Sequence, residues 1–336
     1  MSAASRSASS ARRVLVSGAS GFIGSRVAAD LQQQGFAVRR MLREQDGAED
    51  CVCADLADPP SLARACEQME LVVHCAGRAH AFGARPAEDE ILQQAVNAAG
   101  SLALAQAAAA AGVRHFVFLS SVKAVGHPGR ECAAEDWPLP PDSAYGRAKR
   151  AAEQSLHALS EQTGMAVTSL RLAMVYGHGS RGNLERMLAG VRAGWFPPLP
   201  DTGGRRSLVH VADVVAAIRS VLDEPRAFGR IWNVASAQQP VVAEIQACAR
   251  VVLGRAPARW SVPAVLLHVA GRVGDGLSAL SGRPLPLSSE IVRRLLDSEC
   301  YSAEAIRQEL GWEARVSLAD GVYEALTGQW PAGRQA

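Results

Sequence analysis

The segment that most constrains the fold of this chain is VLVSGASGFIG, at residues 14–24. Three of its glycines lie between an apolar run that predicts a strand and an amphipathic stretch that predicts a helix. Glycines in this position permit a tight turn, let a pyrophosphate approach the backbone and let the helix pack closely on the strand. The alternative is a strand–helix turn that binds nothing. We expect a dinucleotide site whose contacts here are Gly18, Ser20, Gly21, Phe22, Ile23 and Gly24.

Short apolar runs alternate with longer helical patterns through the first half of the chain. The expected strands cover residues 14–17, 36–41, 51–54, 71–75, 115–120 and 167–171, and the expected helices cover 23–34, 88–111 and 145–161. This alternation is typical of an α/β fold of the Rossmann type, a doubly wound parallel sheet with helices on both faces.

The regular pattern weakens after residue 177. We expect a disordered tail at 1–11, a nucleotide-binding domain at 12–177 and a smaller substrate-binding domain at 178–207 and 237–336, with 208–236 returning to the first domain. No apolar segment of a targeting peptide follows the tail. No run approaches the roughly 18 apolar residues of a membrane span, so none is expected.

The net charge and the cysteines exclude several kinds of binding partner and site. A formal net charge of +2 creates no strong field for nucleic acid or an anionic membrane. The seven cysteines lack the spacing of zinc or redox motifs, so we expect no metal site and a reduced, cytoplasmic protein.

The end of the second strand bears on the choice of cofactor. An acid there accepts the ribose 2′-hydroxyl of NAD, whereas an arginine accommodates the 2′-phosphate of NADP. Here Arg39, Arg40 and Arg43 precede the first acid, Glu44, which favours NADP(H) and leaves NAD(H) possible. Asp55 after the third strand either contacts the adenine or caps a helix, with Leu56 packing beneath it.

Tyrosine and lysine are both rare in this chain, yet Tyr145 and Lys149 share one helical face at positions i and i+4. Lys149 is one of only two lysines. An ammonium group nearby lowers the pKa of a phenol, which lets the phenol act in proton transfer. Ser120 and Ser121 end a predicted strand, where the ligands of open α/β sheets bind.

Together these residues resemble the extended short-chain dehydrogenase/reductase family, in its NAD(P)-dependent nucleotide-sugar epimerase/dehydratase branch. The resemblance covers nearly the whole chain and implies Ser121 as the catalytic hydroxyl, Tyr145 as the acid/base and Lys149 as its partner. It also implies a homodimer. The further cofactor contacts that we expect are Ala76, Gly77, Asn97, Ser120, Tyr145 and Lys149, beside Arg43, Asp55 and Leu56.

Both halves of the chain supply expected substrate contacts. Arg206 opens the stretch RSLVHVAD, which is similar to a family segment whose arginine contacts a diphosphate, a role that suits a bidentate guanidinium. Lys123 is either a substrate contact or a surface lysine. The full expected set is Arg78, Lys123, Asn183, Arg206 and Arg293.

One departure from the family pattern narrows the reaction. Dehydratases of this family follow the catalytic hydroxyl with an Asp-Glu pair, whereas Val122 and Lys123 stand here, so 4,6-dehydration is disfavoured. The expected activity is that of a UDP-N-acetylhexosamine 4-epimerase or a UDP-4-keto-6-deoxy-HexNAc 4-reductase in the synthesis of surface polysaccharide precursors. The alternatives are a steroid- or flavonoid-type reductase and a non-catalytic dinucleotide-binding scaffold.

Overall fold

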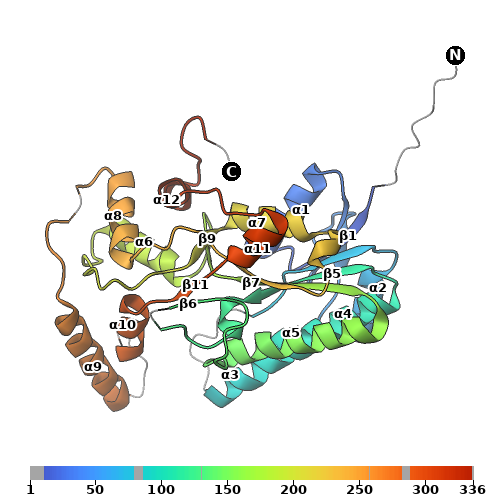
Figure 1. The fold of residues 1–336 in the computed structure, drawn as a ribbon, viewed down its shortest axis with the longest axis horizontal. Helices are drawn as coiled ribbons and strands as arrows, with labels where there is room; N and C mark the ends of the chain where they lie inside the picture. The colour runs from blue at the N-terminus through green and yellow to red at the C-terminus, as the bar shows by residue number, and fades with distance from the viewer. Residues whose placement is uncertain (1–10, 79–85, 130, 257, 282–287, 335–336) are drawn as a thin grey trace.

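The computed structural model describes residues 11–78, 86–129, 131–256, 258–281 and 288–334 (Figure 1). The expected tail at 1–11 lies outside the described residues as far as residue 10. Within the described part of the chain, no helix combines the length and the apolar character that a bilayer span needs.

A seven-stranded parallel sheet forms the centre of the molecule, in the order β10-β7-β5-β4-β1-β2-β3. Every residue of β5 is buried, as expected for a parallel strand that is covered on both faces. The prediction of a doubly wound Rossmann sheet is confirmed. The strands are β1 (Arg13–Ser17), β2 (Ala37–Leu42), β3 (Cys51–Cys53), β4 (Leu71–His74), β5 (His115–Ser121), β7 (Ala166–Leu172) and β10 (Ile231–Val234).

Helices cover both faces of this sheet (Figure 1). One face carries α2 (Pro59–Cys66), α4 (Gly100–Ala110) and α5 (Ala144–Thr163). The other carries α1 (Phe22–Gln33), α7 (Val211–Val221) and α11 (Glu304–Leu310). Side chains alternate along each strand, so β1 sends Leu15 into one core layer and Val14 and Val16 into the other.

The helix expected at 88–111 is interrupted. It forms α3 (Pro86–Gln93) and α4, joined by a π-helical segment, Gln94–Ala99. Such π segments are rare inside helices and are frequent at functional sites. The interruption contains Asn97, one of the expected cofactor contacts.

The second half of the chain builds a smaller layer on the carboxyl edge of the sheet. Of the segment 208–236, β10 joins the main sheet beside β7, but β9 (Leu208–His210) pairs with β8 (Met174–Tyr176) in a separate ribbon. A third core lies among α6 (Asn183–Ala193), α8 (Val242–Val252) and α12 (Leu318–Thr327). The helices α9 (Ala264–Ser281) and α10 (Ser289–Leu296) lie at one end of the molecule (Figure 1).

The expectation that all seven cysteines are reduced is wrong for one pair. Cys132 on β6 (Cys132–Ala133) and Cys300 on β11 (Cys300–Tyr301) form a disulfide across 168 residues of sequence. The two strands pair in parallel with these residues in register, which brings their Cα atoms to 4.4 Å. Spacing along the chain carries no sign of this pairing, because it depends on the tertiary fold.

Candidate active site

The glycine loop lies where β1 and β4 diverge, which is the crevice that binds dinucleotides in this type of sheet. Gly18 has a φ of +66°, and a Cβ there would lie 2.7 Å from the backbone nitrogen of Ala76. A Cβ on Gly24 would lie 2.2 Å from the carbonyl oxygen of Gly18. No side chain caps α1 and no acid stands in its first turn, so the backbone N–H groups of that turn face a potential anion. The loop therefore fits a pyrophosphate.

A second close approach lies at the end of β4. A Cβ on Gly77 would lie 2.7 Å from Oδ1 of Asn97 and 3.5 Å from Nζ of Lys149. The Asn97 side chain accepts a hydrogen bond from the backbone N–H of Arg78 and donates to the carbonyl of the same residue. The π segment thus holds the loop after β4 against the crevice, and Asn97 fills the position that a Cβ on residue 77 would take, so only glycine fits there.

Beneath this loop runs a buried hydrogen-bond chain that the sequence analysis missed. Ser101 donates to the carbonyl of Asn97, so Nε2 of His74 must donate to Ser101, and Nδ1 accepts from Ser17. Ser17 in turn accepts from the N–H of Ala76. Burial lowers the pKa of His74 to about 3, so the ring stays neutral. The available signal was a histidine at the end of an otherwise apolar buried strand.

Tyr145 and Ser121 lie together at the carboxyl edge of the sheet. Ser121 ends β5, and its Oγ accepts from the backbone N–H of Lys123 at 3.2 Å, which leaves its own hydrogen free to donate. Tyr145 lies in the first turn of α5, which Ser143 caps through the N–H of Gly146. Burial raises the pKa of Tyr145, and a hydrogen bond with Ser121 opposes that rise. Without a cofactor the phenol is therefore protonated at neutral pH.

Lys149 lies one turn further along α5, buried behind the phenol. Its ammonium donates to the carbonyl of Leu119 at 2.8 Å and lies 4.6 Å from the centre of the Phe118 ring and 6.0 Å from that of Tyr145. Burial lowers the pKa of Lys149 to about 8. At this distance from the Tyr145 ring the ammonium favours a phenolate, and it lies 3.5 Å from where a Cβ on Gly77 would stand.

Ser120 takes a different direction from Ser121. Its hydroxyl donates to Oε1 of Glu153 at 2.6 Å, and Glu153 forms a two-bond ion pair with Arg171 on the neighbouring strand β7. Both charged side chains are about 1% exposed. Ser120 therefore faces a structural ion pair under α5, and its expected contact with a cofactor stays a prediction.

Two of the three arginines in and after β2 form hydrogen bonds or ion pairs with other residues of the protein. Arg39 donates to the carbonyls of Ala65 and Glu67, at the end of α2. Arg40 binds both carboxylate oxygens of Asp50 and one of Asp46. Arg43 is exposed and is the one arginine of the three whose side chain has no partner among the described residues. Of the three arginines that favoured NADP, only Arg43 therefore remains available to bind its 2′-phosphate.

Asp55 does not cap α2, because the residue at the cap position of that helix is Asp58. Oδ1 of Asp55 accepts from the N–H of Ala57 and closes a turn that leads to α2. Leu56 lies under Gly100, where an added Cβ would come within 2.9 Å of it. Neither contact involves a cofactor, and the adenine contact of Asp55 stays a prediction.

Lys123, which had no settled role, meets a carboxylate from the far end of the chain. Its ammonium lies 2.7 Å from Oε1 of Glu299, whose other oxygen lies 3.2 Å from Nη1 of Arg206. Glu299 thus joins two of the expected substrate contacts beside Ser121. Sequence analysis missed Glu299, because a lone glutamate before a two-residue strand carries no signal.

The remaining expected substrate contacts are less constrained. Asn183 begins α6 and Arg293 lies on α10, and both are exposed. The buried Nε atoms of Arg78 and Arg206 have no hydrogen-bond partner among the described residues, so both guanidinium groups keep a donor available. Nη2 of Arg206 donates to the carbonyl of Arg294. No group of His, Cys, Asp or Glu side chains in the described part of the chain is arranged to hold a metal ion.

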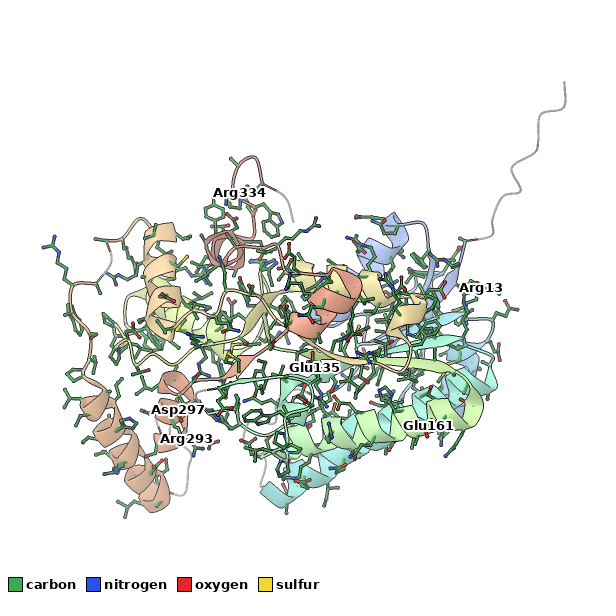
Figure 2. The ribbon with its side chains drawn as sticks, viewed as in Figure 1. Arg13, Glu135, Glu161, Arg293, Asp297 and Arg334 are labelled. Carbon is green, nitrogen blue, oxygen red and sulfur yellow. A yellow bond between two sulfur atoms is a disulfide. The ribbon has the colours of Figure 1, made fainter. Side chains whose placement is uncertain are left out.

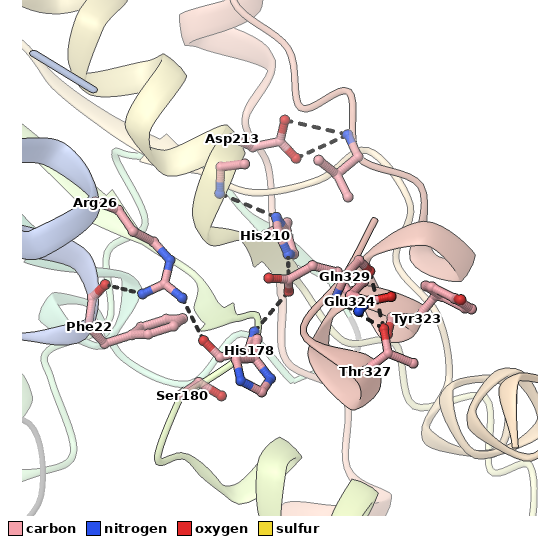
Figure 3. A network of polar contacts seen from close by, with 12 residues as sticks. Phe22, Arg26, His178, Ser180, His210, Asp213, Tyr323, Glu324, Thr327 and Gln329 are labelled. Atoms are coloured by element: carbon pink, nitrogen blue, oxygen red, sulfur yellow. Dashed lines mark hydrogen bonds and ion pairs between the residues drawn. The ribbon is translucent and has the colours of Figure 1, made fainter. Parts of the chain in front are cut away.

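A polar network ties the glycine loop's helix to the end of the chain (Figure 3). Arg26 on α1 donates to the carbonyls of Phe22 and His178. The N–H of His178 donates to Glu324 on α12, and the same carboxylate oxygen lies 3.1 Å from Nε2 of His210. The segment after β8 is thereby held over the first turn of α1.

Comparison with known proteins identifies the family. The model of the NAD dependent epimerase/dehydratase family matches residues 14–235, which contain the glycine loop, Ser121, Tyr145 and Lys149. The chain belongs to this family. It is an enzyme family of the extended short-chain dehydrogenase/reductase type, and its dependence on NAD gives the cofactor class. The expected preference for NADP gains no support from the family or from the engaged arginines of β2.

Individual members of the family are similar along almost their whole length. A UDP-glucose 4-epimerase of Vibrio cholerae is 28% identical over 320 residues, covering 92% of this chain and 93% of that protein. A ceramide reductase of Caulobacter vibrioides is 28% identical over 325 residues, covering 92% and 91%. The solved structure of MoeE5 in complex with UDP-glucose and NAD shares the fold, with a TM-score of 0.73 at 24% identity over 94% of this chain and 97% of that one.

Proposed function

We propose that this enzyme oxidises or reduces C4 of a nucleoside diphosphate sugar, with a UDP-N-acetylhexosamine or a UDP-4-keto-6-deoxy-HexNAc as substrate. The observation that carries the proposal is the position of Tyr145 at the carboxyl edge of the sheet, hydrogen-bonded to Ser121 and with Lys149 one turn further along α5. The 4-epimerase from Vibrio cholerae and the UDP-glucose bound to MoeE5 support a UDP-sugar as the ligand.

In this proposal each residue has one task. Tyr145 takes the proton of the O4 hydroxyl during oxidation and returns it during reduction. Ser121 donates a hydrogen bond to O4, and Lys149 stabilises the phenolate. The nicotinamide, when bound, supplies or accepts the hydride. Arg206 and Lys123 bind the diphosphate side of the substrate, and they exchange contacts with Glu299 for contacts with its oxygens.

The assay that tests this proposal separates the two outcomes of the same chemistry. A 4-reductase oxidises NADPH or NADH when UDP-4-keto-6-deoxy-HexNAc is added, whereas a 4-epimerase interconverts UDP-GlcNAc and UDP-GalNAc with no net change in absorbance of the reduced nicotinamide. Failure of both conversions with purified protein would refute C4 chemistry on these sugars.

Replacing Tyr145 by Phe removes the proton donor and keeps the ring. We expect kcat to fall roughly 10²–10⁴-fold, the usual contribution of a general acid or base, while NAD(H) binding changes little. Tyr323→Phe on α12 is the matched control, because its hydroxyl has no partner among the described residues. Turnover by Tyr145→Phe at the rate of the control would exclude the tyrosine mechanism.

For the cofactor we propose NAD(H). Of the three described arginines in and after β2, only Arg43 has a side chain free to contact the 2′-phosphate that NADP(H) would add. Titrating the protein with NADH and with NADPH, followed by nicotinamide fluorescence, tests this. Arg43→Ala should leave NADH affinity unchanged and weaken only NADPH. Tighter binding of NADPH than NADH by wild type would restore the NADP preference.

A second candidate is reduction of a lipid carbonyl, which the ceramide reductase relative supports. UDP distinguishes the two candidates, because a ligand that binds only the folded state raises the melting temperature. Stabilisation by UDP favours the sugar nucleotide, and stabilisation by a long-chain ketone but not by UDP favours the lipid.

We also propose that residues 178–207 and 237–336 form the substrate domain. The enzyme is, in this proposal, a homodimer that acts on precursors of surface polysaccharides.

A further inference from the structure

The helix α9 presents its large apolar side chains to the outside of the protein. Six aliphatic side chains on it are between 51% and 86% exposed. From Leu266 onward they are spaced by three and four residues, and Val265 precedes Leu266 directly, so all six lie on one side of the helix as a continuous stripe. We call this set the aliphatic stripe; its members are Val265, Leu266, Val269, Val273, Leu277 and Leu280.

The opposite side of α9 is the one that packs on the protein. Gly271 and Gly274 are its buried residues, and a Cβ on Gly271 would lie 3.0 Å from the backbone of Ser289 on α10. Surface helices of globular proteins have the reverse arrangement, with the apolar side inward and polar residues outward. The stripe extends along a helix of 18 residues, about 27 Å at 1.5 Å per residue. It is therefore an unpartnered apolar surface rather than a few scattered side chains.

The surroundings of the stripe indicate what covers it. Arg259, Arg272 and Arg293 are exposed and have no acidic partner among the described residues, whereas the nearby acids Asp275 and Glu290 bind the N–H of Ser289 and the guanidinium of Arg294. Among the described residues here, four arginines (these three and Arg294) stand against three acids (Asp275, Glu290 and Asp297), which leaves a small positive excess. In Figure 2 Arg293 lies on α10, beside α9.

Two exposed tryptophans near α9 are typical of a surface that meets lipid headgroups. Trp195 and Trp260 are 69% and 63% exposed, and both line one open cavity of about 590 Å³. Trp260 precedes the first turn of α9. Tryptophan rings are enriched at the depth of lipid headgroups, where an amphipathic ring is most stable.

We propose that α9 docks the protein on an anionic lipid bilayer, with the helix lying in the plane of the membrane surface. The aliphatic stripe enters the boundary of the acyl chains, Arg259, Arg272 and Arg293 contact lipid phosphates, and Trp195 and Trp260 lie at headgroup depth. α9 does not span the bilayer. The docked helix packs directly on α10, whose Arg294 carbonyl accepts from Arg206, so the membrane-facing end lies beside the expected diphosphate contacts.

The experiment uses the full chain and vesicles of defined composition. We expect the wild type to sediment with vesicles of phosphatidylglycerol and phosphatidylethanolamine, and to bind vesicles of phosphatidylcholine at least about tenfold more weakly. Emission of Trp195 and Trp260 should shift to shorter wavelength on binding to the anionic vesicles, because the other four tryptophans are less exposed.

The variant Val269→Gln/Val273→Gln tests the stripe, and His268→Gln is its control. All three positions are exposed on the same helix, but His268 lies off the stripe. Glutamine favours helix formation more than valine, so folding should be unaffected. We expect the double variant to bind anionic vesicles at least about tenfold more weakly and the control to bind as wild type. Turnover of a water-soluble UDP-sugar, measured without vesicles, should be equal in all three proteins.

Three outcomes would overturn the proposal. The first is a wild type that stays in the supernatant with both kinds of vesicle. The second is equal vesicle binding by wild type and Val269→Gln/Val273→Gln. The third is a change in molar mass by light scattering between wild type and the double variant without any vesicle binding, which would make the stripe a contact between copies of the chain. Because the UDP-sugar assay is independent of lipid, a failure of docking is distinguishable from a failure of the proposed activity.

Discussion

Glu153 shows how much a single buried charge supports the site above it. It accepts from Ser120 and from two nitrogens of Arg171, and water reaches neither side chain of the ion pair. Glu153→Gln leaves the guanidinium of Arg171 buried without its counter-charge, and we expect a loss of about 3–5 kcal/mol in the free energy of unfolding. Urea unfolding measures this loss.

The control for that variant is Glu309→Gln. Glu309 pairs with Arg230 where both side chains are about one-third to one-half exposed, so the loss there should not exceed about 1 kcal/mol. Equal losses in the two variants would mean that the Glu153–Arg171 pair is not shielded from water.

Lys149 gives stability a dependence on pH. Its pKa is about 8 in the folded protein and 10.5 in the reference state, so between these values the unfolded chain binds more protons than the folded protein. Raising the pH through this window therefore stabilises the folded state, on the order of 3 kcal/mol for the full shift. The difference in unfolding free energy between wild type and Lys149→Met should grow by that amount from pH 8 to 10.5. A flat difference would mean that the amine is solvated.

At the scale of elements, the loop after β4 depends on the absence of a side chain at Gly77. Gly77→Ala places a methyl group 2.7 Å from Oδ1 of Asn97, so either Asn97 or the loop must move. We expect NAD(H) to bind at least about tenfold more weakly, as a steric overlap of this kind typically costs 1–3 kcal/mol. Isothermal titration measures the affinity.

Gly276→Ala is the matched control, because nothing lies within 4 Å of the added Cβ and the site is inside a helix. It should leave NAD(H) affinity unchanged. Unchanged affinity in Gly77→Ala as well would show that the loop after β4 does not border the cofactor.

The elements that sequence predicts well are those with a local signature. Most strands of the main sheet are predicted correctly because they are short apolar runs between polar turns, and the start of α1 is predicted correctly because three glycines mark it. The π segment around Asn97 escaped prediction, since its residues favour an ordinary helix and only the contact with Arg78 distinguishes it. The separate pairing of β9 with β8 also depends on tertiary contacts.

In the candidate site, too, sequence predicts the residues that have a local pattern and misses those that are brought in by the fold. Tyr145 and Lys149 are visible from sequence because their spacing defines one helical face. Glu299 is not, because it reaches Lys123 across 176 residues and has no local pattern around it. Nor could sequence tell Ser120 from Ser121, since adjacent residues on a strand point to opposite sides and only the packed α5 decides which side holds Glu153.

At the scale of the whole molecule, the disulfide joins β6 to the C-terminal strand β11. A thiol titration of the denatured protein should find five free cysteines without a reductant and seven after reduction. Reduction removes a cross-link that closes a long loop, so we expect the free energy of unfolding to fall by roughly 2–5 kcal/mol. Seven reactive thiols in the unreduced protein would contradict the bond.

The network of Arg26, His178 and Glu324 has a consequence for how the protein is made. A chain leaves the ribosome from its N-terminus, so the glycine loop emerges among the first segments and α12 among the last. Until Glu324 is synthesised, the N–H of His178 lacks this acceptor, and of the bonds in this network only the one from Arg26 holds the segment over α1. A nascent chain can therefore assemble most of its sheet early, but it completes this network beside the glycine loop only when translation is almost finished.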